Sequence, residues 1–215
     1  MNQQADPSRW LSRALAPMLL VASATVPAGI PDASEPTRRL TQTRELHQRT
    51  AKVVEQAQVT HLAQRYRRPT ESIRGIVRAA ERAGARYDLP PALLLAIVET
   101  ESSFNPAARS SYGARGLMQV VPRHHPTAIA RIGGAHRLGE PEVALDVGAR
   151  ILADYVNRSG SLERGLHRYS GGANRYAAKV LSRQRALERV AIHATRQLDT
   201  PLAATRAANR PSNPS

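Results

Sequence analysis

Cysteine is absent from this 215-residue chain, and aromatic residues are scarce, with one Phe, one Trp and six Tyr. The lack of cysteine excludes a disulfide framework, a Cys nucleophile, a thiolate metal site and a lipidated N-terminal Cys. Hydrophobic residues still make up 41% of the chain, close to the globular average, so a fully disordered polyelectrolyte is not expected. A core must therefore be built mostly from Ala, Leu, Val and Ile.

Acidic residues are also few. The chain has 17 Asp and Glu residues but 31 basic residues, nearly all of them Arg, and its formal net charge is +14. The Arg residues are scattered along the chain, so they would attract any polyanion and constrain the partner only weakly. Because no interleaved aromatic residues and no zinc-finger spacing accompany the charge, we expect no specific nucleic-acid partner.

Long hydrophobic runs are missing, apart from the stretch Ala14 to Val26. It follows Arg9 and Arg13, precedes small residues and is shorter than the roughly twenty residues of a membrane span. Residues 1–28 are therefore predicted to be a signal peptide, which would make the protein periplasmic or associated with the cell envelope. No transmembrane span would remain after its removal. An uncleaved amphipathic anchor is the alternative.

Strand-like alternation is lacking as well, so the fold class is predicted to be all-α. Residues 29–70 are expected to hold a linker, from Pro27 to Arg38, and an amphipathic helix over 43–64 that docks on the main domain. Residues 71–194 are predicted to form the main domain. Its first helix is expected to end at Gly84 and its last at about Ala194. Residues 195–215 have the composition of a disordered tail.

A buried helix is predicted to end in a candidate general acid. Residues 92–98 are apolar on every side, and Glu101 follows at the end of the same helix, next to Phe104 and Pro106. Desolvation there would raise the pKa of the carboxyl group, which is what a general acid requires. Glu99 lies about 200° around the helix from Glu101, so we expect it to be an exposed or capping residue without a catalytic role.

Two sequence runs follow in order after the buried helix. They read Glu101-Ser-Ser-Phe-Asn-Pro106 and Ser110-Ser-Tyr-Gly-Ala-Arg-Gly-Leu-Met-Gln119, and Tyr169 lies downstream. From chemistry alone, Met118 and Gln119 are expected at the edge of a pocket. With these motifs, residues 71 to 192 resemble the soluble lytic transglycosylases, whose catalytic domain has a goose-type lysozyme-like fold.

The resemblance implies a peptidoglycan lytic transglycosylase, a lyase that needs no cofactor. Glu101 would be its single catalytic acid and base, cleaving the β-1,4 bond between N-acetylmuramic acid and N-acetylglucosamine and leaving 1,6-anhydro ends. Peptidoglycan strands would be the partner, with cell-envelope machinery as a further candidate. The implied substrate-binding residues are Ser110, Gly116, Leu117, Met118, Gln119, Tyr169 and Tyr176.

The chain departs from the family pattern at two places. Tyr169-Ser170-Gly171-Gly172 stands where the family commonly has Tyr-Asn-Ala-Gly, so a hydroxyl replaces the usual amide. His124 and His125 follow the second run in an unusual sequence, but adjacent histidines in a loop are usually solvent-facing, and no metal site is expected.

Three alternative functions remain open. They are a lysozyme-like hydrolase, a non-catalytic peptidoglycan-binding or assembly factor of a secretion or conjugation apparatus, and a nucleic-acid-binding protein attracted by charge alone.

Overall fold

The computed structural model describes the backbone of residues 35–208 and the side chains of residues 37–198. The predicted signal peptide lies outside the described residues, as do most of the predicted linker and residues 209–215. The chain divides after Leu40 into two compact units. Of the first unit the structure describes only residues 35–40, which belong to a helix, and the packing concerns Thr41 onward.

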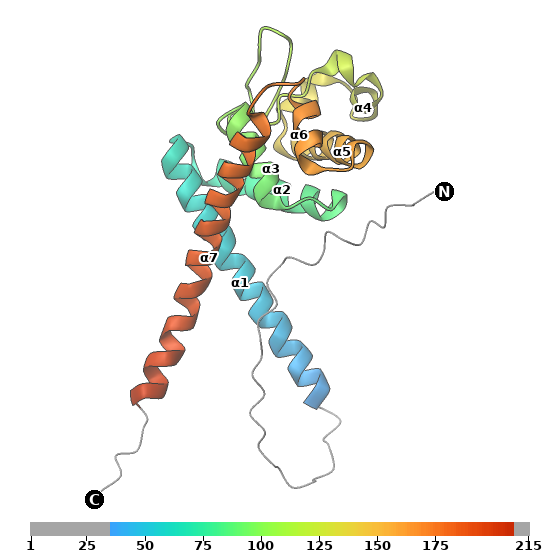
Figure 1. Ribbon diagram of the computed structural model, residues 1–215. Helices are drawn as coiled ribbons and strands as arrows, with labels where there is room; N and C mark the ends of the chain where they lie inside the picture. Colours follow the sequence, from blue (N-terminus) through green and yellow to red (C-terminus); the bar gives the residue numbers. More distant parts are fainter. Residues whose placement is uncertain (1–34, 209–215) are drawn as a thin grey trace, which may run out of the picture. The chain divides into compact units, whose positions relative to one another are not determined.

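The described residues form an all-α fold, as the sequence predicts (Figure 1). No named strand occurs among them, and two isolated β-bridges link Arg115 to Arg109 and to Val120. None of the helices within residues 35–208 combines the length and apolarity needed to cross a bilayer. The α-helices are α1 (Glu35–Tyr66), α2 (Thr70–Tyr87), α3 (Pro91–Glu101), α4 (Pro126–Arg131), α5 (Pro141–Ser159), α6 (Leu162–Tyr169) and α7 (Tyr176–Ala208), with 3₁₀ turns η2 (Pro122–His124) and η3 (Ala135–Gly139).

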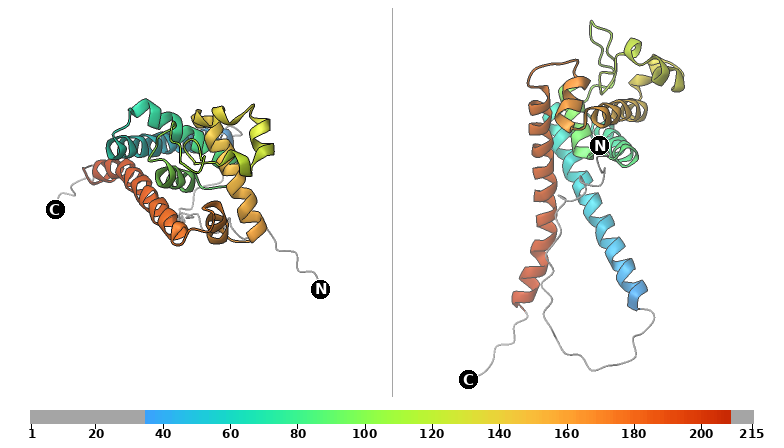
Figure 2. Two further views of the ribbon diagram at one scale, coloured as in Figure 1. Left: turned by 90° about the horizontal axis from the view of Figure 1, so that it is seen from above. Right: turned by 45° about the vertical axis from the view of Figure 1, so that its right-hand side comes forward.

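Helix α3 forms the centre of the core. All side chains from Leu93 to Val98 are fully buried, as expected for a helix that is apolar on every side. Helices α2 and α7 pack directly on α3, α5 packs on α2, and α6 packs on both α5 and α7 (Figure 2). The C-terminal end of α3 is thereby fixed against helices that come from widely separated parts of the sequence.

Helix α2 continues past the residue that was predicted to end it. The sequence predicts an end at Gly84, but α2 runs on to Tyr87 and is capped by Asp88, which has a left-handed backbone with φ 54°. Gly84 is instead required for packing, because a Cβ there would lie 2.6 Å from the carbonyl oxygen of Leu89. The glycine therefore permits the close turn between α2 and α3.

Helix α1 is longer than predicted and docks over a shorter length. It already includes the last residues of the predicted linker, from Glu35 onward. Side chains from Thr41 to Arg49 are exposed, including Leu46. The C-terminal part of the helix joins the core, through side chains such as Val59 and Leu62. The helix is stabilised mainly by its last turns, because the polar first half has no apolar face to bury.

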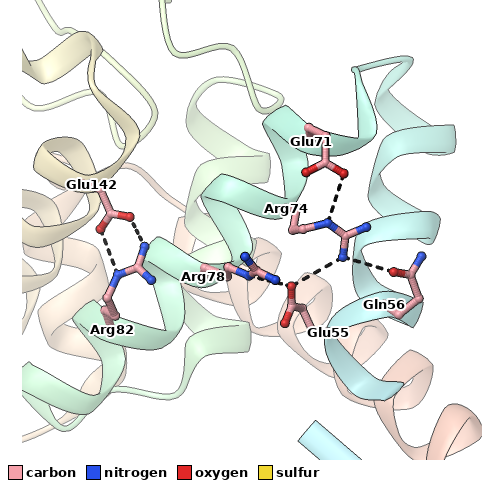
Figure 3. A network of polar contacts seen from close by, with 7 residues as sticks. All are labelled: Glu55, Gln56, Glu71, Arg74, Arg78, Arg82 and Glu142. Atoms are coloured by element: carbon pink, nitrogen blue, oxygen red, sulfur yellow. Dashed lines mark hydrogen bonds and ion pairs between the residues drawn. The ribbon is translucent and has the colours of Figure 1, made fainter. Parts of the chain in front are cut away.

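Arginine side chains of α2 connect it to the helices on either side. Arg78 donates a hydrogen bond of 2.8 Å to Glu55 of α1, and Arg74 lies 3.5 Å from the same carboxylate. Arg82 pairs with Glu142 at the start of α5 (Figure 3). These partly exposed pairs fix the register of α2 but add little stability, since exposed ion pairs contribute about 0–1 kcal/mol each.

Helix α7 extends beyond its predicted end near Ala194 and reaches Ala208. Between residues 194 and 208 Ala occurs five times and Leu and Arg twice each, and these residues have high intrinsic helix propensity, whereas the three Thr, Asp199 and Pro201 do not. Residues 195–208 are helical, although their composition resembles that of a disordered segment. The division of the chain into a main domain and a tail stays a prediction.

Candidate active site

Glu101 is the last residue of α3 and lies half-buried in a cleft of about 530 Å³. The end of the helix is held by Ser102, whose hydroxyl donates to the carbonyl oxygens of Val98 at 3.0 Å and Leu117 at 2.8 Å. The second of these bonds joins the helix end to the loop that carries the second sequence motif. The position of the carboxyl group is thus fixed by contacts to two segments of the chain.

The chain turns sharply just after Glu101. Ser103 and Phe104 both adopt left-handed backbone conformations, with φ of 49° and 60°, although neither is glycine. The turn directs the Phe104 ring into the core, where its centre lies 5.0 Å from that of Tyr66. Burial of the single Phe of the chain offsets the backbone strain, which costs about 1–3 kcal/mol per residue at such positions.

The carboxyl group of Glu101 accepts a hydrogen bond from a tyrosine at the start of α7. The distance from Tyr176 Oη to Glu101 Oε1 is 2.6 Å. Burial raises the pKa of Glu101, while the Tyr176 hydroxyl and the nearby Lys179 ammonium lower it, and the effect of burial is the largest of the three. Glu101 is therefore held toward its neutral, proton-donating form.

A second tyrosine, Tyr169 at the end of α6, donates a hydrogen bond of 2.9 Å to the carbonyl oxygen of Met118. Burial raises the pKa of Tyr169 well above its ordinary value, and it also raises that of Tyr176. Both phenols consequently keep their protons at neutral pH and act as donors. Tyr169 attaches the end of α6 to the loop of residues 110–119, called the motif loop, and Tyr176 attaches the start of α7 to Glu101.

The motif loop contributes less to the cleft than its sequence suggests. The side chains of Leu117 and Met118 are fully buried in the core, so the predicted place of Met118 at the pocket edge is wrong. Met118 packs on Gly148 of α5, where a Cβ would lie 2.4 Å from its sulfur atom. At Gly116, with φ of 74°, a Cβ would lie 1.9 Å from the Leu138 carbonyl oxygen. Gly116, Leu117 and Met118 thus determine the conformation of the motif loop by packing in the core, and their side chains do not line the cleft.

Gln119 does line the cleft, as expected. Its backbone is left-handed, with φ of 48°, and its side-chain NH₂ donates to the carbonyl oxygens of Gly116 at 2.9 Å and Ala108 at 3.2 Å. Ser110 also lines the cleft, and its hydroxyl accepts a hydrogen bond from the backbone N–H of Ala114 at 3.0 Å. A role of either residue in substrate binding stays a prediction.

Sequence reasoning missed part of the cleft wall. Tyr112, Tyr155, Arg168 and Ile151 also line it. His124, His125 and Ser170, which the sequence already singles out as departures from the family pattern, line it as well. One signal was available in the composition, because four of only six tyrosines in the chain line this one cleft. In a protein so poor in aromatic residues, each tyrosine is a candidate for a binding surface.

Glu99 does not behave as predicted. The sequence predicts an exposed or capping residue, but the Glu99 side chain is only 6% exposed and lies 3.3 Å from Arg183 and 3.6 Å from Arg65. It lines a different cleft, of about 490 Å³, on the side of α3 that faces α7. Its burial is possible because two guanidinium groups balance its charge. The rotation of about 200° between Glu99 and Glu101 correctly predicts that they face apart.

Glu101 is the sole carboxyl group among the described residues that line its cleft. Glycosidases that hydrolyse their substrate through two carboxyl groups hold them roughly 5–9.5 Å apart across the scissile bond. The described part of the cleft offers one half of such a pair. The arrangement therefore suits chemistry in which a single group first donates and then accepts a proton.

Comparison with known proteins agrees with the sequence motifs. The family model described as "Transglycosylase SLT domain" matches residues 78–192. The "Transglycosylase" of Enterobacteria phage PRD1 is 38% identical over 102 residues, which are 46% of this chain and 37% of the phage protein. "Membrane-bound lytic murein transglycosylase C" of Yersinia pestis (strain Pestoides F) is 35% identical over 106 residues, which are 43% of this chain and 30% of that protein.

The matched region is only part of these longer proteins, and this chain spans about a third of their length. A crystal structure of an inactive mutant of the lytic transglycosylase Slt from Pseudomonas aeruginosa aligns with a TM-score of 0.42 and 20% identity, over 57% of this chain and 24% of that one. The family model itself covers more than half of the present chain, and on that match the chain belongs to the transglycosylase SLT domain family.

Proposed function

We propose that this chain is a peptidoglycan lytic transglycosylase that acts in the cell envelope. The substrate would be the glycan strand, cleaved at the β-1,4 bond between N-acetylmuramic acid and N-acetylglucosamine. Membership of the family and the names of the relatives support this class of activity. The observation that carries it is Glu101, a half-buried carboxyl group in an open cleft, hydrogen-bonded to Tyr176 and with no second carboxyl among the described lining residues.

The reaction would use Glu101 twice. The protonated carboxyl group first donates its proton to the glycosidic oxygen as the bond between that oxygen and C1 of the muramic acid breaks. The resulting carboxylate then accepts the proton of the C6 hydroxyl of the same sugar while O6 forms a bond to C1. The products are a free hydroxyl on the leaving sugar and a 1,6-anhydro end, and Glu101 is protonated again. No water is consumed.

The electrostatics of the site favour both steps. Burial raises the pKa of Glu101, so that it starts the reaction as an acid. The Tyr176 hydroxyl, at 2.6 Å, and the nearby Lys179 then stabilise the carboxylate that forms. Burial thus favours the neutral form of the carboxyl group, and Tyr176 and Lys179 favour the charged form that arises during turnover.

The test is digestion of purified peptidoglycan followed by mass spectrometry of the sugar ends. We expect 1,6-anhydro ends from the wild type, and a rate at least about 100-fold lower for Glu101→Gln, because loss of general acid catalysis typically costs 10²–10⁴-fold. A circular dichroism spectrum of the variant serves as the control for folding. Reducing ends would indicate the hydrolase instead. Binding without cleavage by the wild type would indicate the non-catalytic assembly factor.

A further inference from the structure

One end of the catalytic cleft is cationic and aromatic. Arg168, in the last turn of α6, lines it directly before Tyr169, and its guanidinium carbon lies 5.1 Å from the centre of the Tyr155 ring of α5. The ring of His125 is 6.3 Å from the same tyrosine ring. Arg168, Tyr155 and His125 are called the arginine end of the cleft below.

No carboxylate of the protein occupies Arg168 in the described part of the chain. None of the ion pairs among side chains 37–198 includes Arg168, although many of the other exposed Arg residues are paired. The neighbouring Asp154 is bound by Arg158 at 2.9 Å. Within the described lining, Glu101 is the sole acid, and burial holds it toward its neutral form. The guanidinium group is therefore available to a ligand.

The chemistry of this end selects a particular ligand group. A guanidinium group binds a carboxylate through two parallel hydrogen bonds. Because the Arg side chain is already stacked over an aromatic ring, it loses less rotamer freedom when a ligand binds. The Tyr155 ring can at the same time contact the apolar face of a sugar. A neutral glycan would leave the guanidinium group without a partner.

We propose that the arginine end of the cleft is a subsite for a carboxylate carried by a substituent of the glycan strand, and that Arg168 makes the enzyme select anionic over neutral strands. This inference rests on the proposed function and goes beyond it. Peptidoglycan offers two sources of such a group, the acidic peptide and, on a muramic acid that carries no peptide, the lactyl group. Both present the same chemistry to Arg168.

Arg168 supplies the permanent charge of this subsite. Burial and the adjacent His124 lower the pKa of His125, against the opposing effect of Asp154. The lowered pKa favours the neutral form of His125, which contributes ring surface to this end of the cleft. The selection of anionic strands should consequently persist at pH 7–8, where histidine carries no charge and Arg stays protonated.

The experiment compares three preparations of the same peptidoglycan. The first is native, the second has lost its peptides to an amidase, which frees the lactyl carboxylates, and the third has all carboxylates converted to neutral amides with carbodiimide and ethanolamine. We expect the wild type to cleave native strands about tenfold faster than amidated ones, because one charge-assisted hydrogen bond changes a binding or rate constant by about this factor. In Arg168→Ala this ratio should fall several-fold, to the part that the remaining overall charge of the protein supplies, while Arg168→Lys should lose less of it.

Arg164→Ala is the matched control. Arg164 is exposed, lies one turn before Arg168 on α6 and does not line the cleft, so its loss changes the net charge equally. It should keep the wild-type ratio. Stripped strands that behave like native ones would show that the subsite accepts a lactyl carboxylate as well as a peptide carboxylate, and stripped strands that behave like amidated ones would assign the bound carboxylate to the peptide.

The proposal is overturned if Arg168→Ala keeps the wild-type ratio, or if Arg164→Ala loses it to the same extent. The proposed function can fail separately. If the wild type makes no anhydro ends from any strand, pelleting of Glu101→Gln with the native and amidated polymers still compares their affinities. Equal binding of Glu101→Gln and of Glu101→Gln with Arg168→Ala to native strands would then reject the subsite.

Discussion

At the scale of single residues, Glu101 is subject to two opposing influences. Burial favours its neutral form, whereas the hydrogen bond from Tyr176 and the charge of Lys179 favour the carboxylate. A general acid that must also act as a base needs both, because a carboxyl group that could never ionise would not release its proton. Tyr176 is thus expected to set the pH range of the enzyme as well as the position of its acid.

Tyr176→Phe should extend activity to higher pH while lowering its maximum. The acid must be protonated, so kcat/KM falls as pH rises through the pKa of Glu101. Loss of the hydroxyl removes a donor that stabilises the carboxylate, which raises this pKa and moves the basic limb of the profile to higher pH. Turnover should fall roughly tenfold, since the carboxylate formed in the reaction loses a charge-assisted hydrogen bond.

The measurement is the pH profile of kcat/KM on native peptidoglycan, with melting temperatures recorded in parallel. Loss of one partly exposed hydrogen bond should cost only about 1 kcal/mol of the free energy of unfolding. A basic limb that stays in place or moves to lower pH would contradict the role assigned to Tyr176. Equal losses of activity and melting temperature would show that its role is structural.

At the scale of elements, residues of α3 and α7 line two clefts, and the contact between these helices positions side chains in both. Arg183 of α7 donates to the Thr100 hydroxyl at 2.6 Å and lies 3.3 Å from the buried Glu99. Tyr176 is seven residues earlier on α7, about two turns away on the same face, and reaches Glu101. The ion pair of Glu99 on one side of α3 therefore helps to fix the helix that presents Tyr176 on the other.

Arg183→Ala should destabilise the protein by about 2 kcal/mol or more. Breaking a fully buried ion pair costs about 3–5 kcal/mol, and the loss is smaller here because Arg183 is 27% exposed and Arg65 still lies near Glu99. Most of the cost arises from the carboxylate that is left behind. Adding Glu99→Gln to Arg183→Ala should therefore recover part of the lost stability.

Urea unfolding of the two single variants and the double variant measures this coupling. Arg185→Ala, at an exposed position on the same helix, is the control for loss of an arginine and should stay within about 0.5 kcal/mol of the wild type. Free energies of unfolding that simply add in the double variant would show that Arg183 and Glu99 do not stabilise each other.

At the scale of the whole molecule, the local patterns predicted the helices and the acid, but not the contacts between distant segments. The apolar run from Leu93 to Val98 predicted a buried helix that ends at Glu101. The sequence pattern at Gly84 indicates a helix end, whereas in the structure Gly84 stays helical and makes room for the nearby Leu89 carbonyl oxygen. The burial of Glu99 depends on a distant partner, because Arg183 lies 84 residues away in the sequence. Such partners are defined only by the packing of helices.

The net charge of +14 allows a last prediction for the whole molecule. Charge spread over the surface attracts an anionic polymer through long-range forces, which salt screens over about 10 Å at 0.1 M and about 3 Å at 1 M. Binding of Glu101→Gln to native peptidoglycan should therefore fall several-fold between these salt concentrations, as measured by pelleting. Binding to carbodiimide-amidated strands should change far less, because the polymer then carries few charges. An equal loss on both polymers would assign the attraction to contacts other than the overall charge.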